Sequence, residues 1–128
     1  MSGENGFTLV ELILVVAILG MLAVAVAPQV GHIMGRSQTL TAEGTAGQVR
    51  SGIQTFYAKF LVQNGTSFWP PMLDASALGN CGDEGCFGGV LNDPLFSEDW
   101  SKDGDNDYRH LPTNQVYHYS PASGVFKH

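Results

Sequence analysis

The chain has little charge, because only 14% of its 128 residues are Asp, Glu, Lys or Arg, against roughly 25% in average proteins. Six Lys and Arg face twelve Asp and Glu, so the formal net charge is −6 at pH 7. Nucleic-acid binding by counterion release needs the opposite sign, so we expect no nucleic-acid partner. Disordered chains combine low hydrophobicity with high net charge, whereas 44% of these residues are hydrophobic.

Motifs for catalysis are also missing. The sequence has no Ser/His/Asp arrangement, nucleotide-binding glycine loop or zinc motif, and its four His residues are scattered. We therefore expect a protein that is not an enzyme and requires no cofactor. Two cysteines allow at most one disulfide, which excludes a disulfide-dense scaffold. The length leaves room for one domain, and 16 Gly indicate many loops.

A long apolar run near the N-terminus dominates the sequence. Eighteen of the 22 residues from Phe7 to Pro28 are apolar, and a helix needs roughly 20 such residues to cross a bilayer. A removable signal peptide is the alternative, with a basic start and an apolar stretch of roughly 7–15 residues. Because this start has no Lys or Arg and the run is longer, we expect a retained membrane helix.

One acidic residue interrupts this run. Glu11 is the only charge between Glu4 and Arg36. A carboxylate inside a membrane costs a few kcal/mol, and ionisable residues there are functional candidates. A tolerated Glu at the membrane interface is the alternative, because Glu11 lies only about one turn into the expected helix.

The segment Gly6-Phe7-Thr8-Leu9-Val10-Glu11-Leu12, followed by the apolar run, resembles the start of type IV pilins and of the pseudopilins of type II secretion. The resemblance implies that a prepilin peptidase cuts between Gly6 and Phe7 and that the new Phe7 amine is methylated. The leader differs from the family pattern, because Glu4 and Asn5 stand where Lys or Arg is usual.

The charge at Glu11 has a physical explanation in such a family. Cleavage would create a positive amine at Phe7, four residues before Glu11. In a staggered bundle of helices, the Glu11 carboxylate of one subunit would meet the Phe7 amine of its neighbour. The pair would neutralise two charges in an apolar environment and set the register of the bundle.

The apolar run is expected to continue into a second, amphipathic helix. Apolar residues recur at steps of three and four, with polar residues between them: Ala46, Val49, Ile53, Phe56, Tyr57, Phe60 and Leu61. This stripe is typical of a face packed on a core rather than of a ligand site. Gly20 and Pro28 are expected to loosen and bend a continuous helix rather than end it, and Asn64-Gly65 is a good C-terminal cap.

The remainder predicts a loop-rich head with short strands. Candidate strands are 89–91, 115–119 and 124–127, the last two joined by a hairpin turn at 120–124. Tyr117, Tyr119, Val125 and Phe126 are expected to pack a small antiparallel sheet on the helix. The expected fold class is therefore α+β. The resemblance implies a pilin-like arrangement, with a leader at 1–6, a membrane or filament-core helix at 7–28, its amphipathic continuation at 29–64 and a head at 65–128.

Two features of the head carry chemistry. Cys81 and Cys86 bracket four residues, and in the oxidising environment beyond the membrane we expect them to form a disulfide, metal ligation being the alternative. An acidic loop follows, and we expect it either to bind Ca²⁺ through convergent carboxylates or to remain a solvated turn. Its candidate ligands are Asp103, Asp105 and Asp107, with Glu98 and Asp99 as further candidates. A Ca²⁺-binding C-terminal loop is also what the resemblance to major pseudopilins implies.

The sequence therefore predicts a subunit of a type IV pilus-like filament. It would be made as a single-pass precursor in the bacterial inner membrane, processed by prepilin peptidase and passed by pilus or secretion machinery into a homopolymer at the cell surface. One alternative is a major pseudopilin of a type II secretion system, with a periplasmic destination. A second alternative is a non-polymerising membrane protein with a calcium-binding periplasmic head.

Overall fold

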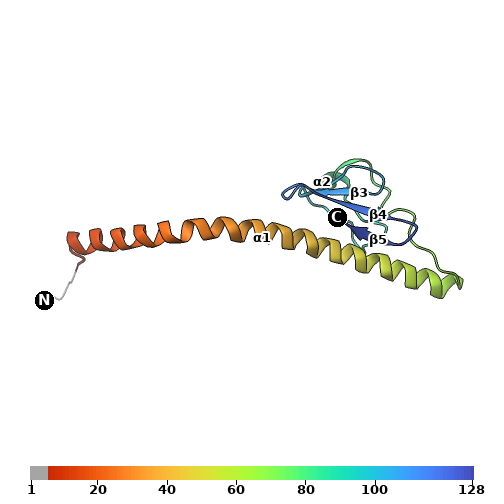
Figure 1. The fold of residues 1–128 in the computed structure, drawn as a ribbon, viewed down its shortest axis with the longest axis horizontal. Coiled ribbons are helices and arrows are strands. Elements are labelled where there is room, and N and C mark those ends of the chain that lie inside the picture. The colour runs from red at the N-terminus through yellow and green to blue at the C-terminus, as the bar shows by residue number, and fades with distance from the viewer. Residues whose placement is uncertain (1–5) are drawn as a thin grey trace. The chain divides into compact units, whose positions relative to one another are not determined.

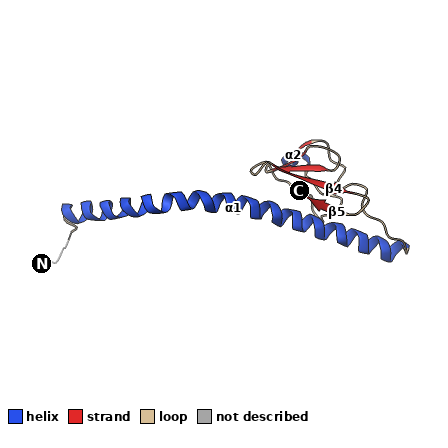
Figure 2. Cartoon of the chain, viewed as in Figure 1, coloured by secondary structure: helices blue, strands red, loops and turns tan. Residues whose placement is uncertain are grey.

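The computed structural model describes residues 6–128. Its elements follow the order α1, β1, α2, β2, β3, β4 and β5 (Figure 1). Two compact units divide the chain, Met1–Ser37 and Gln38–His128, and the long helix α1 (Leu9–Asn64) contributes to both. The long N-terminal helix and the antiparallel sheet confirm the predicted α+β class (Figure 2).

In the first unit, α1 is an apolar helix without a covering layer. Every described residue up to Ser37 is exposed, including the large side chains Leu12, Val16 and Leu22. The helix is long and apolar enough to span a membrane. It continues through Gly20 and Pro28, as predicted, although the ring of Pro28 removes one main-chain hydrogen-bond donor.

In the second unit, α1 packs one face against the head. Its buried residues are spaced at three and four: Ala42, Ala46, Val49 and Ile53. Leu61, predicted to share this face, is 41% exposed, because the head covers the helix only as far as the preceding turn. The helix ends at the predicted place, where Gly65 has φ +70° and its N–H donates to the Leu61 carbonyl at 2.8 Å.

Five short strands form one antiparallel sheet in which each strand lies beside its sequence neighbours. Their bounds are β1 (Gly79–Asn80), β2 (Trp100–Lys102), β3 (Asp107–His110), β4 (Gln115–Ser120) and β5 (Val125–Lys127). The inward side chains are mostly aromatic and meet Leu73 and Phe87 in the core: Trp100, Tyr108, Tyr117, Tyr119 and Phe126. The predicted hairpin between β4 and β5 is confirmed, with Tyr119 opposite Phe126.

Two predictions about the head were wrong. Residues 89–91 form a tight turn rather than a strand, with the N–H groups of Val90 and Leu91 donating to the Phe87 carbonyl. Val125 is 43% exposed, because consecutive strand residues face opposite sides and Phe126 takes the inward position. The strands β1, β2 and β3 were not predicted, since none carries a clear alternation of apolar and polar residues.

Candidate functional site

The start of α1 holds the residues expected to act in processing and assembly. Gly6 and Phe7 precede the helix, and Phe7 is 88% exposed. The rest of the predicted leader, residues 1–5, lies outside the described residues. The Thr8 N–H donates to the Glu11 carboxylate at 3.0 Å, and the Glu11 N–H donates to the Thr8 hydroxyl at 3.2 Å.

This reciprocal pair is a capping box, which satisfies two main-chain donors at the helix start. This role was not predicted from the sequence, although Thr-x-x-Glu before an apolar run is its known signature. Glu11 therefore has a partner within its own chain. Its carboxylate also lies in the first turn, where the helix dipole favours a negative charge.

Cys81 and Cys86 form the predicted disulfide, with their Cα atoms 5.2 Å apart. The bond closes a loop around the short helix α2 (Cys81–Glu84), which begins where Asn80 accepts a hydrogen bond from the Gly82 N–H at 2.7 Å. Both cysteines are buried in the core of the head. The bridge therefore links the glycine-rich loop directly to the core.

The candidate calcium ligands do not lie together. Asp103 accepts a hydrogen bond from Arg109 Nε at 2.6 Å, and Asp107 lies 2.6 Å from His118 Nδ1. Arg109 and His118 are both placed by the β3–β4 hairpin, whose register sets Asp107 opposite His118. The partners of these two aspartates therefore come from the strands, whose register was not predicted from the sequence.

Glu98 lies apart from that loop, near α2, and Asp99 lies near the end of β3. The Glu98 carbonyl accepts a hydrogen bond from Asn80 Nδ2 at 3.2 Å, and the Asp99 carbonyl accepts one from the Leu111 N–H at 2.8 Å. Among residues 6–128, no three His, Cys, Asp or Glu side chains are grouped closely enough to hold a metal ion. Ca²⁺ binding stays a prediction.

A buried polar cluster that the sequence analysis missed centres on Asp74. Lys102 Nζ donates to the Asp74 carboxylate at 2.6 Å and to the Ser76 carbonyl at 2.9 Å, and both ion-pair side chains are about 5% exposed. The other carboxylate oxygen accepts hydrogen bonds from the Phe87 N–H at 2.7 Å and the Tyr108 hydroxyl at 2.8 Å. The Asp74 carboxylate is thus fully bonded on both oxygens.

The titration of this cluster follows from its burial and bonding. Burial alone would raise the pKa of Asp74, but the hydrogen bonds from Lys102, Phe87, Ser76 and Tyr108 together hold that pKa below its ordinary value. Burial, and then the neighbouring Asp74 carboxylate, raise the pKa of the Tyr108 hydroxyl well above its ordinary value. Asp74 is therefore ionised and Tyr108 neutral near pH 7, which favours a structural role.

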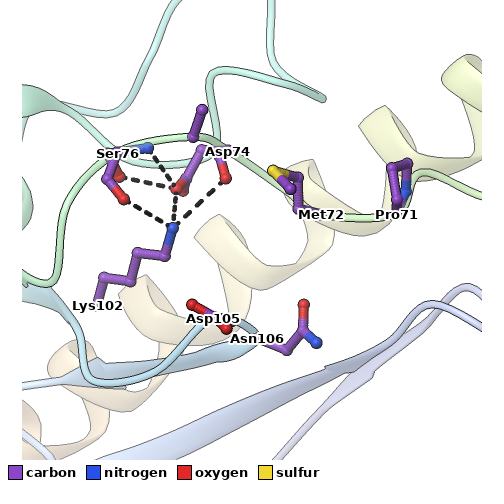
Figure 3. A pocket seen from close by; sticks show the side chains of 8 residues that line it. Pro71, Met72, Asp74, Ser76, Lys102, Asp105 and Asn106 are labelled. Carbon is purple, nitrogen blue, oxygen red and sulfur yellow. Dashed lines mark hydrogen bonds and ion pairs between the residues drawn. The ribbon is translucent and has the colours of Figure 1, made fainter.

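A hollow of about 480 Å³ opens beside this cluster (Figure 3). Asp105 and Asn106 line it together with Pro71 and Met72. The Asn106 side-chain oxygen is buried and has no hydrogen-bond partner among the described residues. An acceptor in this state needs a donor or a cation.

Comparisons with known proteins agree with the N-terminal geometry. A family model described as the prokaryotic N-terminal methylation motif matches residues 1–27. Three type IV major fimbrial proteins FimA of Dichelobacter nodosus are each 44% identical over 54 residues, which is 42% of this chain and 34–35% of each relative. The match thus spans about a third of the length of these curated relatives. No solved structure matches.

The methylation motif, the apolar helix and the small antiparallel sheet together define a pilin-like protein. Its N-terminal segment is similar to that of the type IV major fimbrial proteins and carries the methylation motif.

Proposed function

We propose that the chain is the structural subunit of a type IV pilus-like filament. The observation that carries this proposal is the exposed apolar half of α1, in which none of the described residues up to Ser37 is buried. Such a surface is unfavourable in water, so it needs lipid in the precursor and other copies of the same helix in the filament. The similarity to major fimbrial proteins supports a type IV pilin-like subunit.

Processing would prepare the helix for assembly. Hydrolysis of the Gly6–Phe7 peptide bond by a prepilin peptidase leaves an α-amine on Phe7, which is then methylated. Phe7 is 88% exposed and precedes the first helical residue, so the main chain here is accessible to a peptidase. The new amine retains a positive charge after methylation and lies close to the first turn of α1.

Glu11 would then have two successive partners. In the free chain its carboxylate accepts from the Thr8 N–H at 3.0 Å. In the filament, the amine of Phe7 in a neighbouring subunit supplies a full positive charge in a dry environment. An ion pair between two groups withdrawn from water depends strongly on both partners, because either charge alone is costly there.

Two substitutions separate the cap from the ion pair. Glu11→Gln removes the charge but keeps an amide oxygen that serves equally well in a capping box. Thr8→Ala removes the capping hydroxyl and leaves the charge in place. We expect Glu11→Gln to lower the yield of sheared filaments at least about tenfold, the ratio that 1.4 kcal/mol represents, while Thr8→Ala reduces it less.

The readouts are membrane fractionation and electron microscopy of filaments sheared from cells. Both variants should enter the membrane as the parent chain does. Normal filament yield from Glu11→Gln would overturn the ion-pair role. Parent chains that stay in the membrane and never polymerise would favour the single-pass alternative, and short periplasmic assemblies that require a secretion system would favour the pseudopilin.

We also propose that Ca²⁺ binds beside Asp105 and Asn106. Asn106, whose buried side-chain oxygen has no partner among the described residues, and the exposed Asp105 line the same hollow. Ca²⁺ takes carboxylate, amide and main-chain oxygens in flexible geometry. One carboxylate oxygen of Asp103 bonds to Arg109 and one of Asp107 bonds to His118, so Asp105 and Asn106 are the more available ligands.

Thermal unfolding of the full chain in detergent tests the calcium proposal. If Ca²⁺ binds the folded head but not the unfolded chain, it should raise the Tm of the head, and EDTA should reverse the change. Asp105→Asn should abolish this response, whereas Asp93→Asn, which alters an exposed acid outside the hollow, should preserve it. An equal Tm with Ca²⁺ and with EDTA would end the proposal.

A further inference from the structure

The head carries different surfaces at the two edges of its sheet. The strand order sets β5 at one edge and β1, with α2 beside it, at the other. In Figure 1, α2 and β5 are labelled on opposite sides of the sheet. Each edge strand has at most three residues, so neither offers a long main-chain ladder to a partner.

The β5 edge has a hollow of about 390 Å³ on the outward face of β4 and β5. Val116 and Val125 give it an apolar floor, and they are 40% and 43% exposed. The rim includes His118 and Lys127. His118 is paired with an aspartate, whereas Lys127 forms no ion pair within residues 6–128.

The α2 edge has an exposed aromatic side chain among acids. Phe96 is 64% exposed, and its ring lies beside Gly85, where an added Cβ would come within 3.1 Å of it. Glu84 adjoins Gly85, and the Glu98 side chain lies beside Gly82. No Lys, Arg or His occurs between Lys59 and Lys102, and neither Glu84 nor Glu98 forms an ion pair within residues 6–128.

We propose that the β4–β5 hollow of one head receives Phe96 from the α2 edge of another copy. The valine floor matches the aromatic ring, and Lys127 on the rim matches the Glu84 and Glu98 carboxylates that flank Phe96. Large exposed aromatic residues that enter a partner's pocket are typical interface anchors. This contact rests on the proposed function, which supplies neighbouring copies at high local concentration.

The placement of the two surfaces sets the symmetry of the contact. A two-fold dimer would bring the same patch of both copies together, whereas here each copy contributes a different edge. A contact between unlike surfaces leaves one free edge on each outer copy, so it propagates into a helical array when the rotation between copies does not close a ring. The two edges of the sheet thus provide a contact between neighbouring head domains, and this contact has the polarity that a filament needs.

A cysteine cross-link tests the contact directly. We expect oxidised filaments of Phe96→Cys/Val125→Cys to give a ladder of covalent multimers, while either single variant stays monomeric. Val62→Cys/Val125→Cys is the matched control, because Val62 is also apolar and is 85% exposed, but lies on α1. The native Cys81–Cys86 bond is buried and should persist in all samples.

Charge exchange gives a second readout. Lys127→Glu should lower the yield of sheared filaments, and adding Glu98→Lys should restore it. Filaments that form no Phe96–Val125 ladder, or as much ladder in the Val62 control, would overturn this contact while leaving the proposed function standing. Failure of the parent chain to form any filament would overturn the proposed function, and the contact with it.

Discussion

The two units of this chain differ in whether their apolar surface is buried within the chain. The head covers its aromatic side chains with its own sheet, loops and the second part of α1, and it is closed by the Cys81–Cys86 bond. The first unit leaves all of its described residues exposed. A core inside one chain makes a fold, whereas an apolar surface without a cover requires lipid or other copies. The head therefore folds on its own core, while the first unit carries the apolar surface on which the proposed assembly depends.

The boundary between the exposed and the buried parts of α1 does not lie at its proline. Pro28 is the only proline in the helix, yet burial begins only at Ala42. The compact units accordingly meet between Ser37 and Gln38. The helix therefore carries the lipid-compatible surface of one unit and the core-forming stripe of the other without a break in its secondary structure.

The largest expected effect on the head comes from its buried ion pair. Asp74→Ala leaves the Lys102 ammonium buried without a counter-charge, so we expect a loss of about 3–5 kcal/mol in the free energy of unfolding. Urea unfolding in detergent, followed by Trp fluorescence, measures it, since Trp69 and Trp100 both lie in the second unit. Membrane insertion should not change, because the first unit is untouched.

Two further variants complete that test. Lys59→Ala removes an exposed lysine from α1 and should alter stability by less than about 0.5 kcal/mol. Asp74→Ala combined with Lys102→Met removes both charges and should recover part of the loss. A fully stable Asp74→Ala head would contradict the structural role of the cluster.

A pair of glycines in α1 distinguishes the packed side of the helix from its open side. A Cβ at Gly52 would lie 2.2 Å from the Val90 carbonyl oxygen, whereas a Cβ at Gly47 would meet no atom within 4 Å. Gly52→Ala should therefore destabilise the head by about 1–3 kcal/mol. Gly47→Ala should stabilise it by up to about 1 kcal/mol, because alanine favours the helix. Equal effects in urea unfolding would contradict this packing.

The smallest expected effect is a pH dependence confined to the head. His110 is 1% exposed, and burial lowers its pKa despite the opposing charge of Asp99. Below pH about 6.5, the unfolded chain binds a proton that the folded head does not, so stability should fall as the pH drops. Asp74, whose folded pKa is also lowered, should add a second loss only below about pH 4. His110→Asn should remove the first loss and leave the second in unfolding measured from pH 8 to 3.

The local signals of this sequence predicted the helix and the final hairpin. The apolar run, the i, i+3, i+4 stripe and Asn64-Gly65 are each read within a few residues, and α1 indeed ends at Asn64. The cysteine pair was also predictable, because the two residues are close in sequence. Each of these features depends on contacts between near neighbours.

The missed features depend on distant residues. Asp74 and Lys102 are 28 positions apart, and nothing local shows that the β1–β2–β3 sheet buries them together. The same reason explains Arg109 and His118, which reach the acidic loop only through strand register. The capping role of Glu11 could have been predicted from the sequence. Its charge within an apolar run was instead interpreted as a sign of a role in assembly.

The most direct test of the division between an assembling helix and a self-contained head is the intact mass of the subunit recovered from sheared filaments. We predict a single chain that begins at N-methylated Phe7 and retains the whole apolar part of α1, with two fewer hydrogens for the Cys81–Cys86 bond. A filament subunit that still begins at Met1, or one that lacks the apolar segment, would contradict the account.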